Sequence, residues 1–312
     1  EGNNTFIRNE GKDYGGAIFN SGSSFLLKGT QVFQENSSGA HGGAVANLDG
    51  TFSIEGGATF LKNNSYSGGA LFNWSSQTQF LKATHFEDNK AELGGAISNY
   101  KDATIVLLGT SNDFVKNKAD TYGGAIYNNA ELTITGNTTF EANEAVSGGA
   151  LYNFRGSVDF AGEVNVFRGN VSSGESGAIH NDNGTVRLFG QNNIFEGNEG
   201  GAIRNSGGSI TLVGNNTFLN NHSTNSAALV NEKDGVVNLS GTNIFEGNTK
   251  DGNLLDIENS AVLNFGTDSA PNIITTISGG ISGKGQTFLN QGALVLHAGS
   301  QIHQGSFVAK SG

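Results

Sequence analysis

Short runs of alternating hydrophobic and polar residues, separated by Gly and Asn, recur along most of this chain. In one such unit we expect extended runs around Phe114, over 124–128 and over 131–136. Runs of this length that are rich in β-branched and aromatic residues and bounded by Gly and Asn are typical of strands. No window has the apolar spacing of an amphipathic helix. The pattern therefore predicts an all-β chain.

A Phe followed by two residues and an Asn, the FxxN motif, opens each unit. The motifs are 26–28 residues apart, except for one interval of 23 residues between Phe195 and Phe218. Self-similarity at a fixed period predicts a repeat architecture. The motif begins at Phe6, Phe33, Phe60, Phe86, Phe114, Phe140, Phe167, Phe195, Phe218 and Phe245.

A second motif, Gly-Gly-Ala-aliphatic-x-Asn, follows each FxxN. Seven copies contain Gly-Gly-Ala, and three degenerate copies without it occupy 176–181, 226–231 and 254–259. The Asn residues that close the motif include Asn20, Asn47, Asn73, Asn99, Asn128, Asn153, Asn181, Asn205 and Asn231.

Three strands and three turns in about 27 residues predict one coil of a single-stranded parallel β-helix, a β-solenoid. Stacked at the interstrand spacing of about 4.8 Å, about 11–12 coils would form a rod of about 55–60 Å. We expect one continuous domain over 1–312. Its repeats are regular over 1–265, and divergent terminal coils follow over 266–312.

Equivalent residues of stacked coils should form ladders along the rod. The ten Phe are expected to stack inside as the main hydrophobic contribution. Both sets of Asn are expected at bends, because Asn tolerates left-handed backbone and bonds to nearby main chain, and their side chains can also bond from coil to coil. The Gly pairs suit bends of positive φ or close backbone approach.

The segment between the two motifs varies in length, from five residues over 118–122 to Glu199 alone. We expect it to be a loop on one rim of the rod, where solenoids usually carry contacts. Aromatic residues there and at outward positions are candidate partner contacts. They are Trp74, Tyr100, Phe154, Tyr66 and Tyr122.

Two interpretations of the outward aromatic residues remain open. Phe19, Phe72, Tyr127 and Tyr152 occupy the x position of the second motif, which should point away from the core. The rings could form an adhesive stripe, since exposed apolar patches tend to mark contacts. Alternatively, they could stack on one another and only shield the strand beneath.

Composition and charge exclude several classes of function. The 48 Gly could signal disorder, but 21 Phe and regularly placed aliphatic residues argue against it. A net charge of −11 disfavours nucleic-acid binding and docking on anionic lipid. No apolar run approaches the roughly 20 residues that span a bilayer, so we expect no direct membrane insertion of this segment. The absence of Cys excludes disulfides and thiolate metal sites.

Catalysis on a β-helix needs convergent carboxylates or a calcium site with a base. The best acidic pairs are Asp159 with Glu163 and Glu232 with Asp234, and neither has a partner His or Arg in an evident motif. We interpret them as solvated acids on turns. The six His show no ligand spacing apart from His297 and His303. We therefore expect no catalytic residue, no metal and no cofactor.

The ten alternating FxxN and Gly-Gly-Ala motifs over 6–259 resemble the repeats of the chlamydial polymorphic membrane proteins, which are autotransporter adhesins. The resemblance implies a right-handed β-helix that serves as a surface-exposed passenger. It further implies the cell surface of a Gram-negative bacterium, outer-membrane-anchored or secreted. The implied partner is a protein or glycan receptor on a host cell or a neighbouring cell.

Two other functions remain open. Because an uncapped β-helix has open edges, the chain could stack end to end with copies of itself into an extracellular filament. A polysaccharide-active enzyme is the more distant alternative. Since the first residue is Glu1 rather than Met, we interpret the chain as a mature product or an excised piece.

Overall fold

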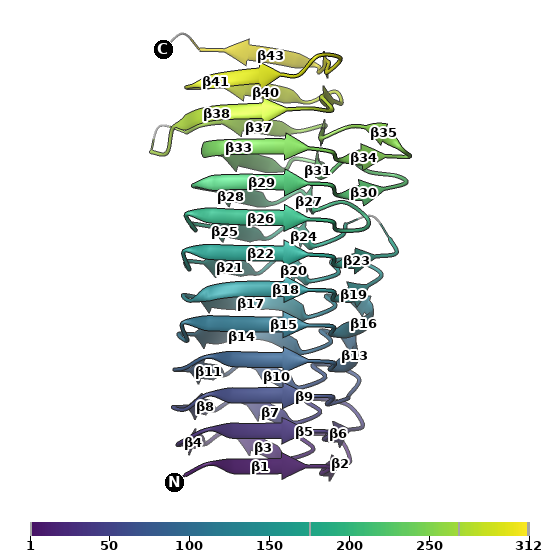
Figure 1. Cartoon of the computed structure of the whole chain (residues 1–312). Helices are drawn as coiled ribbons and strands as arrows, with labels where there is room; N and C mark the ends of the chain where they lie inside the picture. The colour runs from purple at the N-terminus through teal and green to yellow at the C-terminus, as the bar shows by residue number, and fades with distance from the viewer. Residues whose placement is uncertain (1, 175, 268, 311–312) are drawn as a thin grey trace.

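The computed structural model describes residues 2–174, 176–267 and 269–310 and forms a rod of stacked coils (Figure 1). In this part of the chain every regular element is a strand, and none is a helix that could cross a bilayer. The chain crosses the front from left to right, passes round the right-hand side and returns behind while it climbs towards the C-terminus. This is a right-handed coil of about 11 turns with about 27 residues each. The predicted all-β parallel solenoid is confirmed.

The first strand of each coil from Phe6 to Phe245 carries the Phe of FxxN, and the last two coils have Ile277 and Leu296 at this position. These strands form a 12-stranded parallel sheet, here called the first row, in which each Phe up to Phe218 pairs with the Phe of the next coil. The row consists of β1 (Asn4–Ile7), β5 (Gln31–Gln34), β9 (Ala58–Leu61), β12 (Thr84–Glu87), β15 (Ser111–Val115), β18 (Asn137–Glu141), β22 (Val164–Arg168), β26 (Asn192–Glu196), β29 (Asn215–Leu219), β33 (Gly241–Glu246), β38 (Asn272–Ile277) and β41 (Ala293–Leu296).

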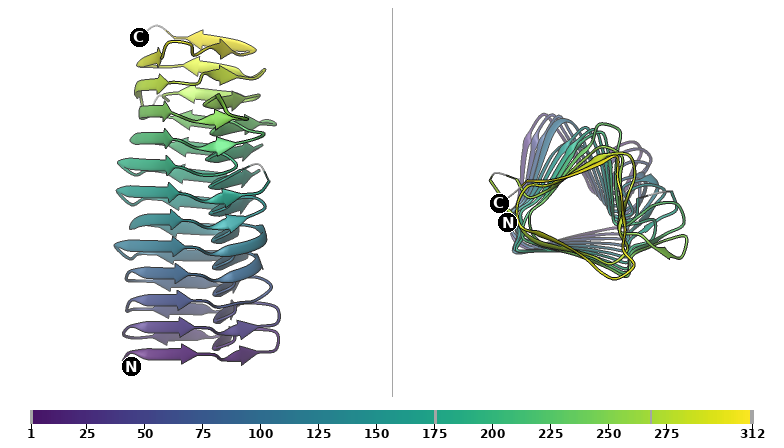
Figure 2. Two further views of the ribbon diagram at one scale, coloured as in Figure 1. Left: turned by 45° about the vertical axis from the view of Figure 1, so that its right-hand side comes forward. Right: turned by 90° about the horizontal axis from the view of Figure 1, so that it is seen from above.

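The other two long strands of each coil form a single 22-stranded sheet that is bent along the rod. The second row is made of β3 (Ile18–Ser21), β7 (Val45–Leu48), β10 (Leu71–Trp74), β20 (Leu151–Phe154), β24 (Ile179–Asp182), β27 (Ile203–Ser206), β31 (Leu229–Glu232), β36 (Ile257–Asn259), β39 (Ile281–Ser282) and β42 (Ile302–His303). The third row is made of β4 (Ser24–Leu27), β8 (Thr51–Ile54), β11 (Gln77–Phe80), β21 (Ser157–Phe160), β25 (Thr185–Leu188), β28 (Ser209–Leu212), β32 (Val236–Leu239), β37 (Val262–Phe265), β40 (Gln286–Leu289) and β43 (Ser306–Ala309). β14 (Ile97–Leu107) and β17 (Ile126–Ile134) pass through the bend and belong to both rows. Seen along the axis, the coil is triangular (Figure 2).

A further set of short strands, here called the rim, follows FxxN in most coils, and isolated bridges at Asn64, Ser67 and Glu199 take their place after Phe60 and Phe195. The rim consists of β2 (Glu10–Gly11), β6 (Ser37–Ser38), β13 (Lys90–Leu93), β16 (Lys118–Tyr122), β19 (Glu144–Ala145), β23 (Val171–Ser172), β30 (His222–Ser223), β34 (Thr249–Lys250) and β35 (Asn253–Leu254). The expectation of a loop over 118–122 is wrong, because β16 pairs with β13 and β19 through its backbone. The last two rim strands form an antiparallel hairpin that projects from the rod (Figure 1).

The Phe residues of FxxN form one continuous stack inside the rod. Successive ring centroids are 4.4–5.0 Å apart, and the planes differ by 1–8°. From Phe33 to Phe245 these side chains are fully buried. Phe80 and Phe160 of the third row meet the stack edge-on. Burial of each such side chain stabilises the fold by about 1.5–3 kcal/mol.

The Asn residues of FxxN form a buried hydrogen-bonded ladder. The Nδ2 of Asn117 donates to the Oδ1 of Asn143 in the next coil at 3.0 Å and to the main-chain oxygen of Phe86 at 2.9 Å. The same contacts recur from Asn36 to Asn221, so each buried amide is satisfied.

A buried carboxylate ends this first ladder. Asp256 accepts a hydrogen bond from the Nδ2 of Asn248 at 2.8 Å and another from the backbone N–H of Gly279. Burial raises the pKa of the Asp256 carboxyl.

The Asn residues of the second motif form another ladder, from Asn20 to Asn259. Each Nδ2 between them donates to the next Asn and to main-chain oxygens at the bend between the second and third rows. Beyond Asn259 the acceptor is the Oε1 of Gln304.

A third Asn ladder, which sequence reasoning missed, lies two residues before the Phe of FxxN in the later coils. It consists of Asn165, Asn193, Asn216 and Asn243, and the Nδ2 of Asn243 donates to Asn272 in the following coil. The previous coil has Thr138 at this position, and the Oδ1 of Asn165 has no hydrogen-bond partner among the described residues.

The motif Asn residues do not take the left-handed backbone that we predicted for them. At the bend after the first row, the residue before the Asn of FxxN takes the left-handed backbone, as Lys116 does with φ 52°. At the bend after the second row, the residue two places after the Asn of the second motif takes this backbone, as Asp49 does with φ 52°. The Asn side chains must point inward to form their ladders, so an outward-facing neighbour makes the turn.

The two Gly of the second motif have different roles. Gly123 has φ 65°, which favours Gly because it lacks a Cβ. At Gly124 a Cβ would lie 2.0 Å from the main-chain oxygen of Gly149 in the next coil.

Candidate binding surface

A strip of stacked aromatic rings covers the outer side of the second row. We call it the aromatic strip; it consists of Tyr14, Phe19, His41, Phe72, Trp74, Tyr100, Tyr122, Tyr127, Tyr152 and His180. The x residue is small at Ala46 and Ser98. In the coil with Ala46, the ring centroids of His41 and Phe72 lie 4.3 Å apart. In the coil with Ser98, the ring centroids of Tyr100 and Tyr127 lie 5.0 Å apart. Rings from other positions therefore bridge the gaps.

The rings at the x position are mostly covered rather than exposed. Phe72, Tyr127 and Tyr152 are buried, and Phe19 at the N-terminal end is exposed. Burial raises the pKa of the Tyr152 phenol, as it does for Tyr100, so both side chains are neutral at physiological pH. Mutual stacking thus describes these positions better than an open adhesive stripe.

The five aromatic residues predicted as partner contacts differ in accessibility. Trp74 and Tyr100 lie together, with centroids 5.9 Å apart, and both are partly buried. Phe154 is also partly buried, and the Arg155 guanidinium lies over its ring. Exposure is 57% for Tyr66 and 36% for Tyr122. Tyr66 and Tyr122 are therefore the most accessible of the five.

The coil with the 23-residue spacing leaves a notch in the rim. In an ordinary coil the four residues 144–147 separate Asn143 from the Gly pair, whereas Glu199 alone does so after Asn198. The notch has a volume of about 410 Å³. It is lined by 172–174 on one side and by 222–224, Thr249, Asp251 and Gly252 on the other, with Glu199 and Gly200 between them.

A groove of about 390 Å³ adjoins the notch at Gly174 and runs over the outer face of the second row. We call it the short-coil groove. Besides Gly174, it is lined by Tyr122, Val146, Ser147, Tyr152, His180, Asp182, Arg204, Ser206, Glu232 and Lys233. The aromatic strip ends here, because Arg204 follows His180 at the x position of the short coil.

Asp182, Arg204 and Glu232 in the short-coil groove form hydrogen bonds with neighbouring side chains. Both guanidinium contacts of Arg204 to Glu232 are hydrogen bonds, at 3.1 and 2.8 Å, and the Ser206 hydroxyl donates to the same carboxylate at 2.7 Å. Although burial acts to raise it, these partners hold the pKa of Glu232 below its usual value. The Tyr152 hydroxyl donates to Asp182 at 3.1 Å. Burial lowers the pKa of His180 to about 4, so this imidazole is neutral at pH 7.

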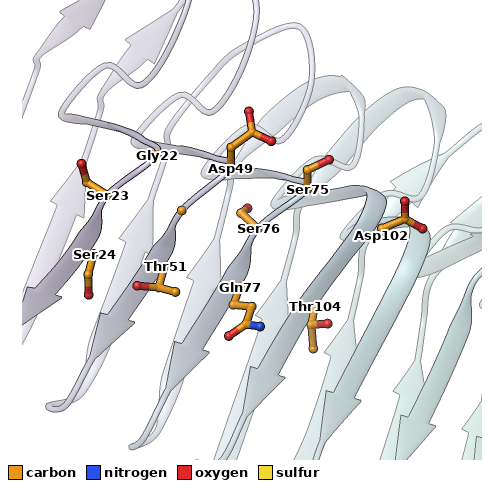
Figure 3. Close-up of a pocket in the computed structure, with 11 residues that line it drawn as sticks. Gly22, Ser23, Ser24, Asp49, Thr51, Ser75, Ser76, Gln77, Asp102 and Thr104 are labelled. Carbon is orange, nitrogen blue, oxygen red and sulfur yellow. The ribbon is translucent and has the colours of Figure 1, made fainter.

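A third depression, lined by Gly, Ser, Thr, Asp and Gln residues, follows the bend between the second and third rows (Figure 3). It has a volume of about 480 Å³. Asp49, Ser75 and Asp102 lie along the bend, while Thr51 and Thr104 stand at the start of the third row. It has no apolar wall against which a ligand could pack.

The acidic residues considered for catalysis are not all free acids on turns, and in this the expectation is wrong. Asp159, in β21, accepts two hydrogen bonds from Arg187 at 2.6 and 2.9 Å, and Glu232, in β31, is held by Arg204. Glu163 and Asp234 are exposed. Among the described residues no three His, Asp or Glu side chains are placed to hold a metal ion.

The segment over 113–129 runs from β15 through β16 into β17 and contains one copy of each motif. It matches the Chlamydia polymorphic membrane protein (Chlamydia_PMP) repeat. The matched segment comprises most of one coil, including its rim strand. No curated protein and no solved structure matches the chain.

Proposed function

We propose that this rod is the non-catalytic, surface-exposed passenger of a bacterial outer-membrane protein and that it adheres to host or neighbouring cells. The observation that carries the proposal is the polymorphic membrane protein repeat over 113–129. The description of that family as membrane proteins of Chlamydia, a Gram-negative bacterium, supports a location at the outer surface.

The distribution of constant and variable positions supports adhesion over catalysis. The motif residues of each coil are used inside, in the Phe stack and the Asn ladders. What differs between coils lies outside, in the length of the rim and in exposed side chains such as Tyr66 and Tyr122. Variable positions on a rigid scaffold are where binding residues usually lie.

Binding of beads coated with the full chain to cultured epithelial cells tests this proposal. We expect binding well above that of uncoated beads, and at least a twofold reduction for the double variant Tyr66→Ser and Tyr122→Ser. Ser is a suitable replacement because Ser147 pairs with Tyr122 in the next coil. Circular dichroism should be unchanged in the variant. Beads that bind neither epithelial nor bacterial cells would refute the proposal.

A further inference from the structure

We propose that the short-coil groove binds an uncharged glycan, such as a chain of neutral hexoses. This inference rests on the proposed adhesive function and names the class of partner. It starts from the chain length of one coil, because the rim is three residues shorter after Asn198 than after Asn143. The shortening leaves the outer face of the second row open beside Arg204.

The charges of the groove favour an uncharged ligand. Two cations, Arg204 and Lys233, face two anions, Asp182 and Glu232, and the carboxylate of Glu232 already engages Arg204. The whole chain has a net charge of −11, which would repel sulfated or sialylated glycans at long range. The groove thus offers many hydrogen-bond donors and acceptors but no excess of positive charge.

The walls of the groove combine polar groups with apolar surface, as sugar-binding sites require. In the middle of the aromatic strip Phe72, Tyr127 and Tyr152 are buried, so their ring faces are not open to a sugar. At the groove the strip ends, and Tyr122 and Val146 are exposed at its edge. The volume of about 390 Å³ lies within the range of about 300–1,000 Å³ typical of ligand pockets.

His180 gives an independent indication of a hydroxyl-bearing ligand. Its Nδ1 lies 2.7 Å from the Ser147 hydroxyl, and its Nε2 is buried without a hydrogen-bond partner among the described residues. An unsatisfied buried polar atom costs about 1–3 kcal/mol. In one neutral tautomer Nε2 is a donor and in the other an acceptor. A sugar hydroxyl can satisfy either tautomer, whereas a carboxylate can only accept.

The decisive variant restores the length of the rim. Insertion of Ala-Val-Ser between Glu199 and Gly200 reproduces the order of residues 144–149 and should close the groove without altering the core. Binding of the full chain is measured on an array of neutral, sialylated and sulfated glycans. We expect neutral glycans to be bound and the insertion to weaken this binding at least tenfold. As a control, Asn64→Ala, at an exposed rim residue outside the groove, should leave it unchanged.

A second variant keeps the test valid if the insertion prevents folding. Arg204→Val introduces the side chain found at the same position of the next coil, Val230, and should also weaken binding at least tenfold. Absence of neutral-glycan binding, binding only to charged glycans, or binding that neither variant weakens would overturn the inference. If one of these results is obtained and coated beads still bind cells through a protein receptor, the groove proposal fails and the proposed adhesive function stands.

Discussion

The coils that begin at Phe114 and Phe195 have the same interior and different exteriors. Both Phe side chains are fully buried in one stack, and the second-motif residues Asn128 and Asn205 belong to one ladder. Outside, the first coil has the five-residue rim strand β16, whereas the second has Glu199 alone. The comparison shows that the ladders fix the position of each coil while the rim can change in length. Variation at the rim can therefore alter the surface without altering the fold.

The largest expected effect comes from the interior. Phe140→Ala removes a buried ring that lies 4.7 Å from Phe114 and 4.9 Å from Phe167, and should lower the free energy of unfolding by about 3–5 kcal/mol. Urea denaturation measures the loss. The matched change Phe19→Ala, at an exposed ring, should cost less than about 1 kcal/mol. Equal losses would show that interior and exterior rings do not differ as described.

Interruption of an Asn ladder should have the next largest effect. Asn143→Ala removes the Oδ1 that accepts from the Nδ2 and the backbone N–H of Asn117, and it removes the Nδ2 that donates to the main-chain oxygen of Phe114. We expect a loss on the order of 3 kcal/mol, because each unsatisfied buried group costs about 1–3 kcal/mol. Asn64→Ala, at an exposed position, should change stability by at most about 0.5 kcal/mol. A similar urea midpoint for both variants would contradict the role of the ladder.

The exterior should respond to pH through His180. Its pKa is about 4 in the folded chain and about 6.5 in an unfolded one, so the unfolded state binds the proton more tightly. Stability should therefore fall as pH decreases from about 6.5 to about 4, by on the order of 2 kcal/mol from this group. His180→Tyr should remove this part of the loss, since Tyr127 and Tyr152 occupy the same position in earlier coils. If the stability of wild type and variant, measured by urea denaturation, changed in parallel with pH, the role of His180 would be disproved.

The smallest effect is expected at the bend after the first row, at the residue before the Asn of FxxN. Lys116 has φ 52°, and Gly169 and Gly197 occupy equivalent positions in later coils. Lys116→Gly should stabilise the chain by up to about 1 kcal/mol, because relief of left-handed strain exceeds the entropy cost of Gly. Val115→Gly, one residue earlier in β15, should destabilise it by at least about 0.5 kcal/mol. Thermal unfolding would distinguish these opposite shifts, and shifts of the same sign would refute the assignment.

The repeat architecture could be predicted because each motif residue makes the same contact in every coil. A Phe every 26–28 residues can become a stack only if the coils are parallel and in register, as the structure shows. An Asn also lies two residues before each of Phe195, Phe218 and Phe245. This N-x-F pattern in the sequence therefore predicts the third Asn ladder as well.

The rim and the groove could not be predicted in the same way. Rim strands such as β19 (Glu144–Ala145) have only two residues and show no alternation, because backbone pairing with neighbouring coils defines them. The short interval before Phe218 was visible in the sequence. That it opens a space beside Arg204, His180 and Glu232 depends on which side chains meet across three coils.

The Asn ladders give the rod an electrical direction. In each buried ladder the Asn-to-Asn hydrogen bonds all run from the Nδ2 of one coil to the Oδ1 of the next coil towards the C-terminus, from Asn36 to Asn63 as from Asn128 to Asn153. The amide dipoles are therefore aligned, and such chains of hydrogen bonds polarise one another. Within each ladder the coil nearer the N-terminus supplies the donor and the next coil supplies the acceptor, and Asp256 and Gln304 supply the acceptors at which the first two ladders end. Two such ladders can continue each other only head to tail.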